Sequence, residues 1–418
     1  MKHTPALLLA LIFLTSTNVA AQTDQHDLTA RRVLSTTPLV DGHNDLPWAI
    51  RRMAGGRVAD YDLRSRTPGH TDLERLQKGM VGAQFWSVYV PGEYADSGYA
   101  RVQLEEFDIA RRVIEMYPDR FKLALTASDV WDAFGEGKIG SILGMEGGHV
   151  IENSLGALRA YYDLGARYMT LTHGVTIDWA DSATDEARHG GLTPFGEEVV
   201  REMNRIGMLV DLSHTSPATM SDALNVTQAP VIFSHSSARA LTDVPRNVPD
   251  SILHRVRENG GIVMVTFVPR FISQEIADYY ETLEQQRKAL QDRYPDDPAQ
   301  VEAALESWTN ANPVPQATLS QAADHIEHIR RVAGVDHVGI GGDFDGIDTV
   351  PVGLEDVSTY PALFAELSRR GWSEADLRKL AGENILRVMR EAEIVAARLQ
   401  RQDGPQFQMT PPRLMPQL

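Results

Sequence analysis

The stretch DGHNDLPW, residues 41–48, carries two side chains of the kinds that bind metal ions, one residue apart. It follows an apolar run, Pro38 to Val40, of the kind found in buried strands, and it ends at a proline. Alternate side chains of an extended strand point to the same side, so His43 and Asp45 would project together from the end of that strand. An imidazole and a carboxylate placed in this way can hold one divalent metal ion.

Residues of the same types end several other short apolar runs. A single histidine at a strand end is more often a hydrogen-bonded core residue than a ligand, and a single aspartate often caps the following helix. Such residues at six of eight predicted strand ends are hard to explain by capping alone, and they indicate a shared site. The further candidates are Glu146 in GMEGG, His173 in LTH, His214 in DLSH, His235 in FSH and Asp343 in GGDFDG.

Eight short apolar runs alternate with helix-length segments along most of the chain. Each run is apolar on both alternations, as expected for strands buried on both faces. The segments 154–165, 194–207, 216–225 and 251–260 have helix start and stop signals. This alternation predicts an α/β fold, a (β/α)8 TIM barrel, whose strand ends meet on one face. The predicted strands lie in TPLVDGHND, GMVGAQFWSVYV, GKIGSILGMEGG, ARYMTLTHG, GMLVDLSH, APVIFSHSS, GGIVMVTFV and DHVGIGGDFDG.

The chain divides into four predicted parts. An early lysine, a short apolar run and small residues up to Ala21 predict a secretory signal peptide over residues 1–21. The hydrolase barrel is predicted over 22–398 and a Pro/Gln-rich tail without an anchor signal over 399–418. A charged helical insertion at about 273–317 follows the seventh strand, where it could be a lid, an oligomer contact or a solvated hairpin without a catalytic part.

Composition narrows the classes of partner. The net charge of −17 opposes binding to nucleic acid or to an anionic membrane surface, which favours small-molecule chemistry. The chain has no cysteine, so disulfides and a lipid-bearing N-terminal cysteine are excluded. The predicted signal peptide by itself indicates an exported protein, in a bacterial periplasm or secreted.

Electrostatics favours metal ions at the predicted site. Three carboxylates gathered in a partly buried pocket repel one another, and one or more would take up a proton unless a cation compensates. Imidazole and carboxylate without thiolate suit zinc, with manganese or cobalt as alternatives. Two ions about 3.5–4 Å apart would share a water molecule and lower its pKa, which implies hydrolysis by a metal-bridging hydroxide. The ligands would be His43 with Asp45 for one ion, His214 with His235 for the other, and Glu146 reaching both.

Two further residues suit the chemistry of hydrolysis. Asp343, if it stays uncoordinated or weakly coordinated, can accept the proton of that water and pass it to a leaving amine. His173 is then free to stabilise the oxyanion that forms on the attacked carbonyl. Loss of either residue should lower the rate more than the metal content.

Together these motifs resemble the membrane (renal) dipeptidase family, the M19 metallopeptidases of the amidohydrolase superfamily. The resemblance spans roughly Thr37 to Leu386 and includes EGGH, WADS after LTH, FSHSSAR and RNVPD. It implies a dizinc dipeptidase that cleaves the single peptide bond of a dipeptide and often tolerates a C-terminal D-residue. It implies the same ligand set as above, and it places His173, Arg246 and Asp343 at substrate-contacting and proton-shuttling positions. Arg246 suits that role because a guanidinium can bind a substrate carboxylate in a bidentate manner. The alternative interpretation is that Arg246 is a surface arginine without a role in binding.

The chain departs from the family's animal members in three respects. It can have neither their disulfides nor their lipid anchor, so any homodimer would be non-covalent. Phe271 stands where animal members have a tyrosine that helps to hold the substrate carboxylate. The insertion at 273–317 has no counterpart in the animal pattern.

Two other readings of the residues stay open. One is a related hydrolase of another small amide or lactone, such as a β-lactam or an N-acyl amino acid. The other is a non-catalytic metal-binding protein on a decayed barrel, against which the presence of both Asp343 and His173 argues.

Overall fold

The structure is a computed structural model that describes residues 25–402 and 404–405, apart from the side chains of 95–97. The predicted signal peptide and most of the predicted tail lie outside these residues. Helix α16 (Asn384–Gln402) buries Ala396 and Leu399, so residues 399–402, expected in the tail, form the last turn of this helix. None of the helices in the described part of the chain is long and apolar enough to cross a membrane.

The parallel strands close into a barrel. The strand order is β2-β1-β9-β8-β7-β6-β5-β4-β3, and a further pairing of β2 with β4 closes the ring without β3. This confirms the predicted TIM barrel, and each of the eight predicted runs contains one of its strands. The barrel strands are β1 (Leu39–Asn44), β2 (Val81–Tyr89), β4 (Ile139–Glu146), β5 (Ala166–Thr170), β6 (Leu209–Asp211), β7 (Ile232–Phe233), β8 (Ile262–Val265) and β9 (Val338–Ile340).

The sheet has one strand besides the eight of the barrel, β3 (Phe121–Leu123), and the sequence does not predict it. It pairs with the first residues of β4, next to the stretch of β4 that pairs with β5. Only Phe121 of its three residues is buried, so it has no apolar run of the kind that marks the barrel strands.

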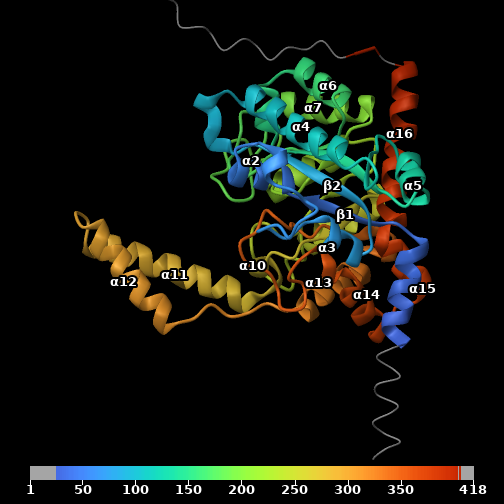
Figure 1. The fold of residues 1–418 in the computed structure, drawn as a ribbon. Helices are drawn as coiled ribbons and strands as arrows, with labels where there is room; N and C mark the ends of the chain where they lie inside the picture. Colours follow the sequence, from blue (N-terminus) through green and yellow to red (C-terminus); the bar gives the residue numbers. More distant parts are fainter. Residues whose placement is uncertain (1–24, 403, 406–418) are drawn as a thin grey trace, which may run out of the picture.

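Helices cover the outside of the barrel (Figure 1). The segments predicted as helices correspond to α6, α7, α8 and α9, and side chains of Ser154, Thr193 and Ser216 accept hydrogen bonds at the starts of the first three. Residues 25–36 are also helical. Besides this segment and α16, the α-helices that pack around the barrel, α6 to α9 included, are α2 (Leu46–Ala54), α3 (Leu73–Lys78), α4 (Tyr99–Met116), α5 (Ala127–Gly135), α6 (Leu155–Asp163), α7 (Pro194–Ile206), α8 (Pro217–Val226), α9 (Asp250–Asn259), α10 (Pro269–Ile272), α13 (Leu319–Ala333), α14 (Tyr360–Arg369) and α15 (Glu374–Arg378).

The predicted insertion is a helical hairpin of α11 (Gln274–Arg293) and α12 (Pro298–Ala311) between β8 and α13. Figure 1 shows the hairpin extending away from the barrel as an arm. It has a small apolar seam, in which Ile276, Val301 and Leu305 are buried and the rings of Tyr279 and Trp308 lie 5.4 Å apart. Its role as lid or oligomer contact stays a prediction.

The interior of the barrel is filled by side chains. Phe85, Tyr168, Ile232 and Met264 are fully buried in one apolar cluster, and the rings of Phe85 and Tyr168 lie 5.3 Å apart. A packed interior leaves the strand ends and the loops that follow them as the place for a site.

Candidate metal centre

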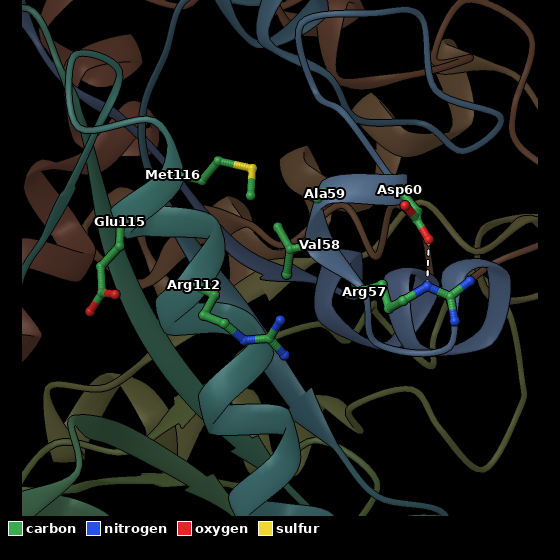
Figure 2. Close-up of a pocket in the computed structure, with 7 residues that line it drawn as sticks. All are labelled: Arg57, Val58, Ala59, Asp60, Arg112, Glu115 and Met116. Carbon is green, nitrogen blue, oxygen red and sulfur yellow. Dashed lines mark hydrogen bonds and ion pairs between the residues drawn. The ribbon is translucent and has the colours of Figure 1, made fainter.

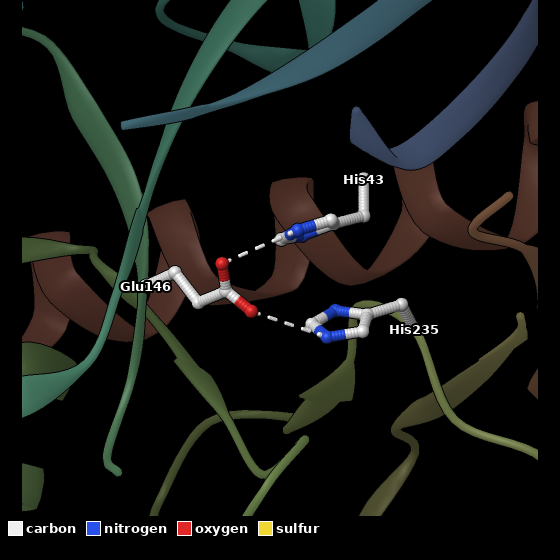
Figure 3. Close-up of side chains that lie close together, drawn as sticks. All are labelled: His43, Glu146 and His235. Carbon is white, nitrogen blue, oxygen red and sulfur yellow. Dashed lines mark ion pairs between the residues drawn. The ribbon is translucent and has the colours of Figure 1, made fainter. Parts of the chain in front are cut away.

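Glu146, the last residue of β4, lies between His43 of β1 and two histidines that follow β6 and β7, His214 and His235. One carboxylate oxygen, Oε2, is 3.5 Å from His43 Nε2, and the other, Oε1, is 3.0 Å from His214 Nε2 and 3.3 Å from His235 Nε2. Figure 3 shows the two oxygens facing His43 and His235. A single carboxylate can therefore reach two groups of ligands at once.

Asp45 and Asp343 extend this cluster on the side of His43. Asp45 Oδ2 is 3.2 Å from His43 Nε2. Asp343 follows β9, and its carboxylate lies close enough to both residues to share a metal ion with them. The structure thus brings together all seven metal, proton-transfer and oxyanion candidates, in three overlapping groups: His43, Glu146 and His235; Glu146, His173 and His214; and His43, Asp45 and Asp343.

His173 lies on the open side of the cluster. Its Nε2 is 3.7 Å from Glu146 Oε1, the longest of the four imidazole to Glu146 distances. Its side chain is 24% exposed, against 12% for His214 and 1% for His43 and His235. His173 is therefore the histidine best placed to meet a molecule that enters from solvent.

Arg246 is buried beside the cluster rather than on the surface, with 4% of the residue exposed. Its guanidinium makes long hydrogen bonds to the Ser236 hydroxyl, at 3.5 Å, and to the His235 carbonyl, at 3.3 Å. It also lies 5.3 Å from the ring centre of Phe271. Burial lowers the pKa of Arg246 to about 10, so it stays charged at neutral pH. The Arg246 guanidinium has five N–H donors and uses two of them in these long bonds, so donors remain that can bind a substrate carboxylate.

The side chains fit a pair of divalent ions. Among the residues that the structure describes, His43 Nε2, Asp45 Oδ1 and His214 Nδ1 are buried side-chain atoms of the cluster without a hydrogen-bond partner. A buried polar atom without a partner destabilises the folded state, and coordination of metal ions would give His43 Nε2 and Asp45 Oδ1 a partner. Burial lowers the pKa values of His214 and His235 well below the usual value, which keeps both imidazoles in the neutral form that binds metal. The set of imidazole and carboxylate ligands suits zinc.

Tyr168 orients His43 from inside the barrel, a contact that the sequence does not predict. The Tyr168 hydroxyl lies 2.9 Å from His43 Nδ1, which leaves Nε2 directed at Glu146. A Cβ atom at Gly144 would lie 2.1 Å from the Tyr168 ring, so the ring can occupy this place only beside a glycine. A tyrosine in an apolar strand is normally interpreted as core, and its role is visible only in three dimensions.

Asp211, the last residue of β6, holds His235 in a similar way. It accepts hydrogen bonds from the Ser234 hydroxyl at 2.6 Å and from the Thr170 hydroxyl at 2.6 Å. The Ser234 oxygen in turn lies 2.8 Å from His235 Nδ1. Asp211 stands in the DLSH motif, and its position at the end of a buried strand is the signal that could have identified it.

The loop that carries Arg246 is fixed from behind by His325 of α13, which accepts a hydrogen bond from the Ala238 N–H at 3.0 Å. Burial lowers the pKa of His325 from 6.5 to about 4. The His325 side chain is therefore protonated at lower pH in the folded state than in the unfolded state. Neutral, buried His325 makes its full contribution to the free energy of unfolding above pH 6.5, and this contribution is lost as the pH falls toward 4. Between pH 7 and 4 the free energy of unfolding should therefore fall by about 3 kcal/mol less in His325→Asn than in the wild type, because asparagine takes up no proton.

Urea unfolding of both proteins at a series of pH values between 7 and 4 measures this difference. The matched control is His254→Asn, on the exposed face of α9. Equal pH dependence of wild type and His325→Asn would contradict the prediction.

A separate surface pocket is lined by Arg57, Val58, Ala59, Asp60, Arg112, Glu115 and Met116 (Figure 2). It includes none of the predicted site residues. The last turn of α4, which forms one wall, leads toward β3, at the end of the barrel opposite the cluster. The Arg57 and Asp60 ion pair and the bond from Arg112 to the Gly56 carbonyl give its charged groups partners within the surface. We interpret this pocket as structural.

Comparison with known proteins adds a family match. The family model described as membrane dipeptidase (peptidase family M19) matches residues 28–403. The probable dipeptidase PvdM from Pseudomonas aeruginosa has a similar fold, with a TM-score of 0.78 at 24% identity over 89% of this chain and 100% of that chain. A metallopeptidase from Rhodobacter sphaeroides, solved with a phosphinate mimic of the dipeptide L-Ala-D-Ala, has a TM-score of 0.69 at 26% identity over 85% of this chain and 99% of that chain. Dipeptidase AC, a metallopeptidase of family M19, gives the same values.

Proposed function

Because the chain belongs to the membrane dipeptidase family, peptidase family M19, and is a metallo-dipeptidase, we propose that it uses two zinc ions to hydrolyse dipeptides, including those with a C-terminal D-residue. The Rhodobacter sphaeroides relative, which was solved with a mimic of L-Ala-D-Ala, supports the extension to D-residues.

One observation carries the proposal of two ions. Glu146 presents one oxygen to His43 and the other to His214 and His235, so the carboxylate separates two ligand groups while contacting both. In our proposal His43 and Asp45 would hold one ion, His214 and His235 would hold the other, and Glu146 would contribute a ligand oxygen to each. When bound, such a pair of ions lowers the pKa of a water molecule and supplies the nucleophile for hydrolysis.

The protein's own side chains then position the substrate and move its protons. Arg246 binds the C-terminal carboxylate of the dipeptide. His173, on the open side of the cluster, donates a hydrogen bond to the carbonyl oxygen as negative charge develops on it. Asp343 accepts a proton from the attacking water and returns it to the leaving amine.

We further propose that the enzyme is exported, to a bacterial periplasm or to the medium. The signal-like sequence of residues 1–21 supports this location. Dipeptides released by degradation of proteins or of peptide-containing polymers would be its substrates there.

The proposal predicts a sharp dependence on substrate length. One extra C-terminal residue moves the carboxylate by about 3.5 Å, away from Arg246 when the same bond is attacked. We expect purified enzyme to cleave L,L- and L,D-dipeptides, to cleave tripeptides and C-amidated dipeptides about 100-fold more slowly, and to lose activity to a chelator until Zn²⁺ is returned. Amine release measured across this panel gives the result.

Two outcomes would count against it. Equal cleavage of dipeptides and tripeptides would reject Arg246 as the residue that measures length. N-acyl amino acids and β-lactams also carry a free carboxylate, and faster hydrolysis of either would assign the site to that alternative substrate class.

A further inference from the structure

Asp343 lies in a turn with an unusual backbone. The φ angles of Asp343 and Asp345 are 65° and 67°, in the left-handed region that few residues other than glycine adopt. In the part of the chain that the structure describes, no group donates a hydrogen bond to the Asp343 carboxylate, so burial and the charges of neighbouring groups act on it without fixing its direction. The backbone of this turn therefore determines where the carboxylate points.

His70, from a segment far away in the sequence, holds this turn by two reciprocal hydrogen bonds. The Asp345 N–H donates to His70 Nδ1 at 3.0 Å, and the His70 N–H donates to Asp345 Oδ1 at 2.7 Å. The His70 ring also lies against Phe344, with ring centroids 5.7 Å apart. A Cβ atom at Gly69 would lie 2.1 Å from Asp345 Oδ1, so the two segments are in close contact. We call this pair of bonds the His70–Asp345 clasp.

The segment that carries His70 is itself rigidly held. Arg75 is 3% exposed and donates to Asp72 Oδ2 at 2.6 Å and to the Gly69 carbonyl at 2.7 Å. Thr71, next to His70, accepts a hydrogen bond at 2.9 Å from Asn44, the residue between His43 and Asp45 in the chain. The clasp therefore ties the Asp343 turn to a fixed body that also contacts the end of β1.

We propose that His70 is a positioning residue that acts through Asp345 to keep the Asp343 carboxylate where it can accept a proton. This inference rests on the proposed function, because it assigns His70 to the proton-transfer step of the hydrolysis. It separates His70 from the metal ligands, since His70 forms part of none of the three groups that could hold an ion among the described residues.

Three substitutions at one position test the clasp. His70→Ala removes the acceptor for the Asp345 N–H and should lower kcat about 100-fold, with KM and the metal content unchanged. His70→Asn places its amide oxygen near the position of Nδ1 and should recover most of kcat. His70→Gln extends the amide to the position of Nε2 and should behave like alanine. Steady-state kinetics and metal analysis of each purified protein give these values.

Hydrogen exchange gives a readout that does not need turnover. Amides of residues 341–347 should exchange faster in His70→Ala and His70→Gln than in wild type and His70→Asn, while residues 209–215, which carry His214, should be unchanged. Unchanged exchange at 341–347, or wild-type kcat in His70→Ala, would overturn the clasp alone. A wild-type enzyme that cleaves no dipeptide would instead overturn the proposed function, so the two failures are distinguishable.

Discussion

Replacing Glu146 with glutamine should remove both the activity and most of the bound metal. We expect kcat/KM to fall by more than about 1,000-fold, the equivalent of several kcal/mol of transition-state stabilisation. Glutamine has nearly the same shape, so the packing of β4 is kept and the change is one of charge. The amide would offer one oxygen to one ion and an NH₂ group, which cannot bind metal, to the other.

The electrostatics of the site explains why this charge matters. Burial raises the pKa of Glu146, but the surrounding histidines, His43 first among them, outweigh it, and the net pKa lies well below the usual value. Glu146 is therefore a carboxylate at neutral pH, within 3.7 Å of four imidazoles. It is the one negative group that our proposal gives to both ions.

A matched control is Ser87→Ala. The Ser87 hydroxyl donates a hydrogen bond to Glu146 Oε2 at 3.3 Å, so this variant disturbs the same carboxylate without removing its charge. We expect a fall in kcat/KM of about 10-fold, typical of an outer partner of a ligand, with both ions retained. Metal analysis of the purified proteins decides, and a Glu146→Gln protein that keeps two ions would show that Glu146 does not bridge them.

The barrel and the cluster could be predicted from sequence for a common reason. Apolar runs mark buried parallel strands, and in a parallel barrel the C-terminal ends of all strands lie on the same face of the barrel. The residues that end these runs therefore had to meet, whatever their separation in the chain. His43 and Glu146, 103 positions apart, lie 3.5 Å from each other for that reason.

The contacts of the supporting residues could not be predicted from the sequence, even where the residue itself carries a signal. Tyr168 has the sequence context of a core aromatic residue, and its contact with His43 depends on the space left by Gly144. Asp211 is marked by its place at the end of a buried strand, but its bond with Ser234 depends on the register of β6 and β7. His70 lies in a loop without strand periodicity, so nothing in its neighbourhood points to Asp345.

Asp343 stands apart from the ligands, and Asp343→Asn should separate proton transfer from metal binding. We expect the variant to keep two ions and to lose about 100- to 10,000-fold in kcat, the usual contribution of a general acid and base. Burial raises the pKa of Asp343 well above its usual value, which makes the carboxylate a better proton acceptor near neutral pH. An amide at this position cannot accept and return a proton.

Asparagine is the substitution that leaves the turn intact. Together with aspartate it tolerates the left-handed backbone better than most residues, so the φ of 65° at position 343 is kept. Asp348→Asn, an exposed change in the same loop, is the control for loss of charge alone and should retain full activity. Because Asp343 lies close enough to His43 and Asp45 to join them as a ligand, metal analysis decides between the two roles. Depletion of one ion in Asp343→Asn would reassign Asp343 as a ligand, and the proton would then need another acceptor.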